Sequence, residues 1–124
     1  MTGTDVITNR ARFLLDDTDV TALRWDDSQL IRYCNDGTRM IITDRPEALL
    51  SSGQVSAALA EIAVIGGTIS IPDRYRDALA HYIASQALAE EAQDKRDLAR
   101  SSAMFNRFVT KANLSQTMRR SNGK

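Results

Sequence analysis

The spacing of apolar residues along the chain predicts helices separated by short polar breaks. Apolar side chains recur every three or four positions in four stretches, as they do on one face of an α-helix. The first stretch is residues 5–15, DVITNRARFLL, for which Thr4 is the expected N-cap. The acidic run 16–19 ends it and opens a loop to about Trp25. The residues expected along one side of this helix are Val6, Arg10, Phe13 and Leu14.

A second helix is expected from about Asp26 to Asp44, because Pro46 prevents further continuation. Asp26 and Asp27 fall in its first turn, where carboxylates complement the unpaired N–H groups and the helix dipole. Trp25, just ahead, is expected to pack back on the core. The expected buried stripe consists of Leu30, Cys34, Gly37 and Ile41, flanked by Ile31 and Met40.

The third and fourth helices are predicted as an antiparallel pair. Pro72 and Asp73 open the third helix, and Asp94 caps the fourth, with Asp97 at the capping-box position. The break between them, EEAQD, is short, and a short connection places two amphipathic helices side by side. The face expected to pack on the third helix consists of Tyr75, Leu79, Tyr82 and Gln86, and Ala78, Ile83 and Ala87 widen this face. The apolar face expected on the fourth helix consists of Leu98, Ser101, Phe105, Phe108 and Ala112, with Met104 and Val109 beside it.

Residues 46–71 have the least regular pattern. Gly66-Gly67 lies between two short apolar runs and is typical of a β-hairpin turn. A helix over 54–63 is the alternative, since that stretch is rich in alanine. The expected fold is therefore all-α, a small bundle of about four helices with a short β-hairpin or irregular insertion. A helical domain, 1–113, precedes a flexible C-terminal arm, 114–124.

Charge is balanced overall but divided along the chain. Residues 1–97 hold ten Lys or Arg against sixteen Asp or Glu, a net charge of −6, whereas 98–124 hold six cations and no acid. This division fits a solvated basic tail, or an arm that binds an acidic protein surface or nucleic acid. The latter possibility makes a small helical nucleic-acid-binding protein one hypothesis. Arg32, Asn35 and Arg39 on the outer side of the second helix are compatible with it, although Asp36 lies among them.

Candidate catalytic chemistry is sparse. A single cysteine, Cys34, excludes an internal disulfide and a cysteine-based zinc site, and no phosphate-binding glycine motif occurs. His81 with Asp77 four residues earlier is conceivable as a base with its orienting acid, but the pair is also a common surface arrangement, which we favour. The acidic run 16–19 lacks the glycine and distal glutamate of a calcium loop. We expect no enzyme activity, metal or cofactor.

The sequence predicts neither a membrane-spanning segment nor a signal peptide. No apolar run is long enough to cross a bilayer, and the N-terminus lacks the layout of a signal peptide. We expect a soluble protein made in a reducing cytoplasm.

Four features follow one another along the chain: a short N-terminal helix, a helix beginning RWDDSQLIRYCNDGTRMI, a helix IPDRYRDALAHYIASQAL and a last helix ending MFNRF. In this order they resemble the head-to-tail adaptor, or connector, proteins of tailed bacteriophages, and the resemblance covers roughly residues 5–112. Cys34 stands where such adaptors more often have leucine. The matching positions are Trp25, Asp27, Leu30, Asn35 and Asp36, then Pro72, Tyr75, Ala78, Leu79, Tyr82, Ala87 and Leu88, and finally Phe105 and Phe108.

The resemblance implies a structural role in the virion neck, after synthesis in the host bacterial cytoplasm. Such adaptors form a ring, usually dodecameric, that docks under the portal protein, meets the next tail or neck protein and passes DNA through its lumen without reading its sequence. The resemblance also implies a portal-docking arm, here Leu114, Met118, Arg119, Arg120 and Lys124. Candidate contacts between neighbouring copies in the ring are Arg74, Arg76, Asp26 and Asp27.

Overall fold

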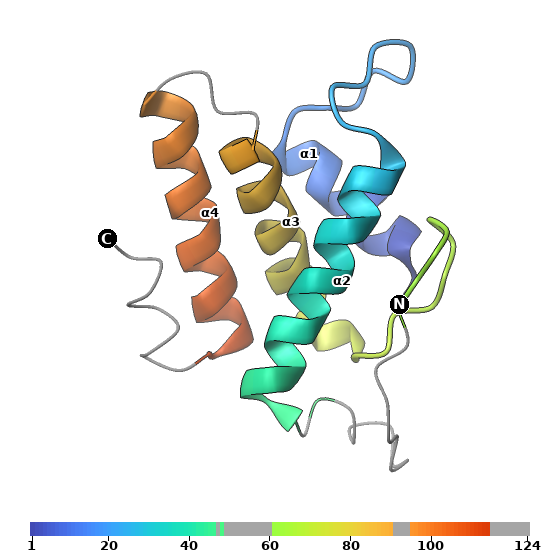
Figure 1. Ribbon diagram of the computed structural model, residues 1–124, viewed down its shortest axis with the longest axis vertical. Helices are drawn as coiled ribbons and strands as arrows, with labels where there is room; N and C mark the ends of the chain where they lie inside the picture. The colour runs from blue at the N-terminus through green and yellow to red at the C-terminus, as the bar shows by residue number, and fades with distance from the viewer. Residues whose placement is uncertain (47, 49–60, 91–94, 115–124) are drawn as a thin grey trace.

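The computed structural model is a bundle of helices around one core (Figure 1). It describes residues 1–46, 48, 61–90 and 95–114. The elements, in chain order, are η1 (Thr4–Ala11), α1 (Arg12–Leu14), α2 (Asp27–Asp44), η3 (Asp73–Tyr75), α3 (Arg76–Glu90) and α4 (Lys95–Ala112). The all-α prediction is confirmed: in the ranges just given the only β pairing is an isolated bridge between Thr2 and Thr68.

The first helix differs from its prediction in both start and buried face. Most of it, Thr4–Ala11, is a π-helix, whose hydrogen bonds span five residues instead of four. The wider turn buries Val6, Ile7, Ala11 and Leu15, and leaves the expected core residues Arg10 and Phe13 exposed. Nor is Thr4 the cap, since its hydroxyl donates to the carbonyl of Ile65 and Gly3 precedes the helix. The prediction was wrong because it assumed an α-helical period.

Helix α2 follows its prediction closely. Asp26 is the N-cap and forms a reciprocal capping box with Gln29, whose Oε1 accepts the Asp26 N–H at 3.2 Å. The stripe Leu30, Cys34, Gly37 and Ile41 is buried as expected. At Gly37 the backbone passes so close to α3 that an added Cβ would lie 2.7 Å from both Leu79 and Tyr82.

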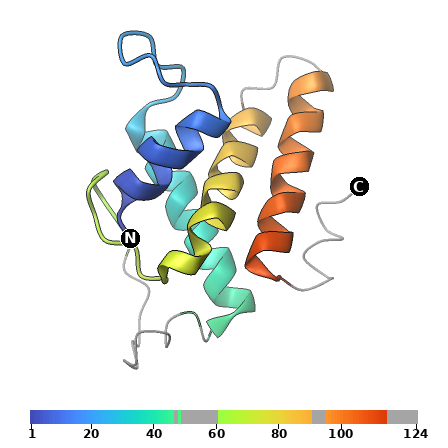
Figure 2. The same ribbon diagram turned by 180° about the vertical axis from the view of Figure 1, so that it is seen from behind.

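Helix α3 is the centre of the bundle rather than a one-sided amphipathic helix. It packs against η1, α2 and α4, and Figure 2 shows it between η1–α1 and α4. Contacts on several sides bury even polar residues, among them His81 and Ser85. The predicted face of Tyr75, Leu79 and Tyr82 is buried, but it is only part of the buried surface. An alanine-rich helix suits this position, because small side chains let three neighbours approach.

Helices α3 and α4 lie side by side as the predicted antiparallel pair (Figures 1 and 2). Tyr82 and Phe108 meet edge to face with ring centroids 4.9 Å apart, and Phe105 lies 5.5 Å from Phe108. Ser101 donates a hydrogen bond of 2.8 Å to the carbonyl of Ser85. Leu98, expected on the buried face, is exposed in the first turns of α4. The predicted cap of α4, Asp94, lies outside the described residues.

The segment 61–71 does not form the predicted hairpin. Gly67 N–H donates to the carbonyl of Val64 at 3.0 Å and makes the expected turn, but the residues after it pair with the N-terminus. Gly3 N–H donates to Gly67 at 2.9 Å, and Ile69 N–H donates to Met1 at 3.0 Å. The hairpin was wrong because pairing with the distant chain end competes with pairing across the turn. The alternative helix over 54–63 falls almost wholly outside the described residues.

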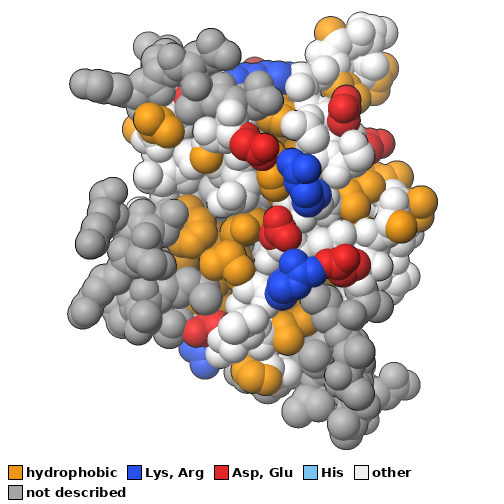
Figure 3. Space-filling model, viewed as in Figure 1, with side chains coloured by type: hydrophobic (Ala, Val, Ile, Leu, Met, Phe, Trp, Pro, Cys, Tyr) orange, Lys and Arg blue, Asp and Glu red, His pale blue; other side chains and the backbone are white. Residues whose placement is uncertain are grey.

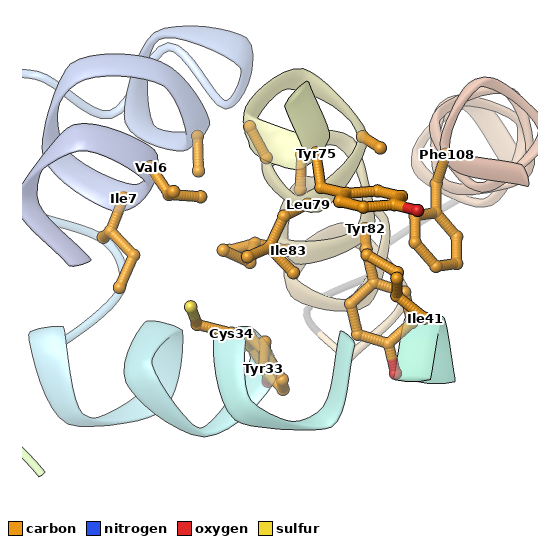
Figure 4. Close-up of a cluster of buried hydrophobic side chains, with 14 of the residues drawn as sticks. Val6, Ile7, Tyr33, Cys34, Ile41, Tyr75, Leu79, Tyr82, Ile83 and Phe108 are labelled. Carbon is orange, nitrogen blue, oxygen red and sulfur yellow. The ribbon is translucent and has the colours of Figure 1, made fainter. Parts of the chain in front are cut away.

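The core gathers side chains from every helix (Figure 4). The Cys34 thiol lies among Val6, Ile7 and Ile83 in this view, and burial raises its pKa to about 12. A thiol with such a pKa stays protonated at neutral pH, so Cys34 is a packing residue and not a nucleophile.

Candidate protein-interaction site

A buried ion pair organises one end of the bundle. Arg12 Nη1 lies 2.7 Å from Asp17 Oδ2, and both side chains are about 5% exposed. The other guanidinium nitrogen, Nη2, lies 2.7 Å from Asp27 Oδ1 at the start of α2. Arg12 therefore ties the first helix to the loop 16–25 and to the N-terminus of α2.

Asp17 in turn fixes the backbone of the loop 16–25. Its carboxylate accepts the N–H of Arg24 at 2.8 Å and that of Trp25 at 3.3 Å, so the two ends of the loop are joined. Trp25 is buried as predicted, and the Arg24 guanidinium lies 4.4 Å from the centre of its ring. Asp16, at φ 55°, turns the chain out of the helix. The loop is thus held at its base by buried polar contacts.

The tip of the loop has its own local support. Asp19 Oδ1 accepts the N–H of Thr21 at 3.0 Å and its hydroxyl at 2.7 Å, and these bonds lower the pKa of Asp19. The fold leaves Val20 85% exposed and Leu23 42% exposed. Figure 1 shows this loop projecting from the bundle, and hydrophobic side chains are visible on it at the upper right of Figure 3.

These apolar side chains border a shallow groove of about 380 Å³, here called the loop groove. Phe13, 67% exposed on the first helix, completes its apolar rim. Of the five large hydrophobic residues exposed in the described part of the chain, three line this one groove. The lining residues are Thr8, Asn9, Arg12, Phe13, Thr18, Val20, Leu23 and Asp27.

The loop groove is suited to apolar contact with another protein. Complete burial of a Phe, Val or Leu side chain contributes about 1.5–3 kcal/mol. Its charged groups, Arg12 and Asp27, are paired with each other and join the first helix to α2. Within the described residues no group of three or more His, Cys, Asp or Glu is placed to hold a metal ion.

A second groove, of about 590 Å³, lies beside the first and contains the only histidine. We call it the His81 groove. His81 is 8% exposed, and its Nδ1 lies 2.7 Å from the carbonyl oxygen of Asp77. Burial, together with the positive charges of Lys111 and Arg107, lowers the pKa of His81. The lining residues are Asn9, Arg10, Phe13, Leu14, Asp77, Ala80, His81 and Lys111.

The prediction of a surface pair between His81 and Asp77 was wrong. The Asp77 carboxylate pairs with Arg10 at 3.0 Å, while His81 contacts only its backbone carbonyl in the hydrogen bonds seen here. The burial arises because α3 is central, which periodicity along one helix does not reveal.

The outer face of α2, considered above for nucleic-acid contact, is engaged within the chain. Arg32 pairs with Glu90 at 3.5 Å, and Arg39 pairs with Asp36 at 3.2 Å and with Glu61. Acidic and basic side chains accordingly alternate across the middle of Figure 3. Asn35 exchanges two hydrogen bonds of 3.0 Å with the backbone of Ile62. The face offers no concentrated positive charge to a phosphate backbone.

The predicted subunit-contact residues also have intramolecular roles. Asp26 caps α2, and Asp27 pairs with Arg12. Arg74 lies over the ring of Tyr75, 4.9 Å from its centre. Arg76 lies 3.7 Å from Asp73, whose pKa is lowered by the N-terminal ammonium group. The structure separates the two arginines from the two aspartates: Arg74 lies in η3 and Arg76 begins α3, whereas the two aspartates lie at the start of α2.

The predicted docking arm is described only at its first residue. Leu114 is buried, and its N–H donates to Val109 at 2.9 Å, so it closes α4 and packs with the bundle. Met118, Arg119, Arg120 and Lys124 lie outside the described residues.

Comparison of the chain with protein-family models, with curated proteins and with solved structures finds no match. None of the described helices combines the length and apolar character needed to span a membrane.

Sequence reasoning missed the loop groove. Val20 and Leu23 were assigned only to a loop, and Phe13 to the same side of the first helix as Val6. The available indication was the position of Val20 and Leu23 inside a loop that begins with three aspartates in four residues.

Proposed function

We propose that this protein is a non-enzymatic head-to-tail adaptor of a tailed bacteriophage, located in the virion neck. In this role copies form a ring under the portal protein, contact the next tail or neck protein, and surround the passing DNA. The observation that carries the proposal is the projecting loop 16–25, whose exposed Val20 and Leu23 rest on a buried ion-paired base.

The loop suits an assembly protein because it presents apolar surface on a preorganised support. Contacts made through a rigid loop lose less conformational entropy on binding than contacts made through a mobile one. The Arg12–Asp17 pair and the bonds from Arg24 and Trp25 supply that rigidity. The net acidic residues 1–97 and the basic residues 98–124 are opposite in charge, and heterologous ring contacts need two different complementary surfaces on each copy.

The arm is proposed to dock on the portal through Arg119 and Arg120. The test is a truncation after Leu114. This truncation keeps the buried Leu114 side chain and its hydrogen bond to Val109, which close the end of α4. A milder variant changes Arg119 and Arg120 to Ala. We expect both to lose binding to the purified portal protein in a pull-down, whereas Arg100→Ala, an exposed cation on α4, retains it.

The same variants decide between this proposal and nucleic-acid binding. Duplex DNA binding of the full chain is measured from 50 to 200 mM salt. Affinity that falls steeply with salt and disappears on truncation would make the protein a nucleic-acid binder instead. Images of purified virions that lack a ring of this chain at the neck would also reject the adaptor role.

A further inference from the structure

The His81 groove and the loop 16–25 both carry apolar side chains and are opposite in charge. The groove is a hollow between the first helix, α3 and α4, with apolar surface from Phe13, Leu14 and Ala80. Arg10 and Asp77, which both line the groove, pair with each other at 3.0 Å, so the positive charge at its rim comes from Lys111. Arg107 adds to the positive field, since its charge and that of Lys111 both act on His81.

The loop presents the opposite combination. Its most exposed hydrophobic side chain, Val20, lies next to the Asp19 carboxylate, and Asp16 is exposed at its base. Arg24, the cation of the loop, is folded over Trp25. The tip is therefore an apolar knob beside negative charge, and the groove is an apolar hollow beside positive charge.

We propose that the loop 16–25 of one copy inserts into the His81 groove of the next copy, with Val20 against Leu14 and Asp19 near Lys111. The proposal rests on the proposed function and names the contact that builds its ring. Donor and acceptor are different surfaces of one chain, so the contact can repeat head to tail from copy to copy until a ring closes.

The energetics fit assembly on a template. Burial of one Val side chain with its neighbours stabilises the contact only modestly, and the translational and rotational freedom lost on association offsets much of that gain. A single loop–groove contact is therefore weak, and the protein is expected to be monomeric when dilute. In a ring each copy makes two such contacts, and docking on a common partner raises the effective concentration.

Cysteine cross-linking of the full chain tests the contact directly. Cys34 is fully buried, so the parent protein offers no competing thiol. One variant carries Val20→Cys and the other Leu14→Cys, and both are examined alone and mixed under mild oxidation at high protein concentration. Leu14 lines the His81 groove but not the loop groove, which limits pairing within one chain. Lys111→Cys, at an exposed position in the same groove, replaces Leu14→Cys if that variant melts early.

The mixture should give disulfide dimers, each variant alone should give none, and the chain carrying both changes should give a ladder of oligomers. Adding Lys111→Glu should slow cross-linking by about threefold, while Arg100→Glu, outside the groove, should not. Dimers from Val20→Cys alone would show that loops pair with each other and would overturn the proposal. Absence of cross-links in every sample would overturn it as well.

Portal binding distinguishes this inference from the proposed function. A chain that binds the portal protein without cross-linking of loop to groove is an adaptor assembled through another surface. Cross-linking without portal binding keeps the head-to-tail contact but removes the adaptor role.

Discussion

Arg12 and Asp17 form an ion pair of 2.7 Å that is about 95% shielded from water on both sides. Removing one partner of such a pair leaves an uncompensated buried charge, at a cost of about 3–5 kcal/mol. Asp17 also accepts hydrogen bonds from the backbone N–H groups of Arg24 and Trp25. The Arg12–Asp17 ion pair therefore couples the folding of the bundle to the conformation of its projecting loop.

Arg12→Met is therefore expected to lower the free energy of unfolding by about 3 kcal/mol, at the lower end of that range because backbone N–H groups still face Asp17. Urea denaturation followed by circular dichroism measures the loss. Arg100→Met, an exposed arginine on α4, is the matched control and should change stability by less than about 0.5 kcal/mol. Equal stability of the two variants would mean that the backbone donors alone satisfy Asp17.

Gly37→Ala tests the close approach of α2 and α3. The new methyl group would lie 2.7 Å from Leu79 and Tyr82, and such overpacking costs about 1–3 kcal/mol. The gain in helix propensity offsets about 1 kcal/mol, leaving a net loss of up to about 2 kcal/mol in thermal or urea unfolding. At Gly66 an added Cβ meets nothing within 4 Å, so Gly66→Ala should be neutral. A stabilised Gly37→Ala protein would contradict the packing described.

His81 should make stability depend on pH. Its pKa is lowered in the folded protein, because burial and the charges of Lys111 and Arg107 disfavour the imidazolium. The unfolded chain thus binds the proton more readily, and stability falls as pH drops below about 6.5 toward the lowered value. Unfolding free energies compared at pH 8 and pH 5 should differ less in His81→Gln than in the parent. An unchanged difference would show that other groups are responsible.

Cys34 should resist thiol reagents in the native protein. Its burial and its pKa of about 12 leave neither access nor thiolate at pH 7. Labelling with a maleimide, followed by mass spectrometry, should occur in urea and not in buffer. A Ser102→Cys variant, exposed on α4, serves as the positive control and should label rapidly in buffer. Fast native labelling at Cys34 itself would indicate local opening of the core.

The contacts at the end of α4 predict that truncation before Asn113 lowers stability, whereas truncation after Leu114 does not. Asn113, at φ 56°, and Leu114 close the helix with N–H bonds to Thr110 and Val109, and the Asn113 carbonyl accepts Arg45 Nε at 2.8 Å. A chain ending at Ala112 should lose about 2 kcal/mol, mostly from the buried Leu114 side chain. A chain ending at Leu114 should match the full protein in thermal unfolding. Equal melting of both truncated chains would show that this closure contributes little.

The parts of the fold that the sequence predicted well are those governed by neighbours along the chain. The α2 boundaries followed from Asp26 and Pro46, and its buried stripe followed from spacing. The antiparallel placement of α3 and α4 followed from a short connection. Capping, helix breaking and periodicity are local, so one sequence is enough to read them.

Two predictions, the hairpin and the exposure of His81, were wrong because they depend on contacts between residues far apart in the sequence. The turn at Gly66-Gly67 was foreseen, but its outgoing residues pair with Met1 and Gly3, more than sixty positions away. His81 looked like a surface residue on its own helix, yet α3 is covered on several sides. Neither outcome is encoded in the spacing of nearby residues.

The sequence by itself determined that this chain is an all-α bundle, where α2 begins and ends, and that Cys34 lies on a buried stripe. Only the tertiary structure decided that Phe13, Val20 and Leu23 share one exposed groove. The first helix turns with a π-helical period, which rotates Phe13 outward. The Asp17 carboxylate holds the loop through hydrogen bonds to its backbone, and it can be buried there only because Arg12 is buried beside it. Helix signals act between neighbours, whereas the position of a loop depends on which distant groups are desolvated together.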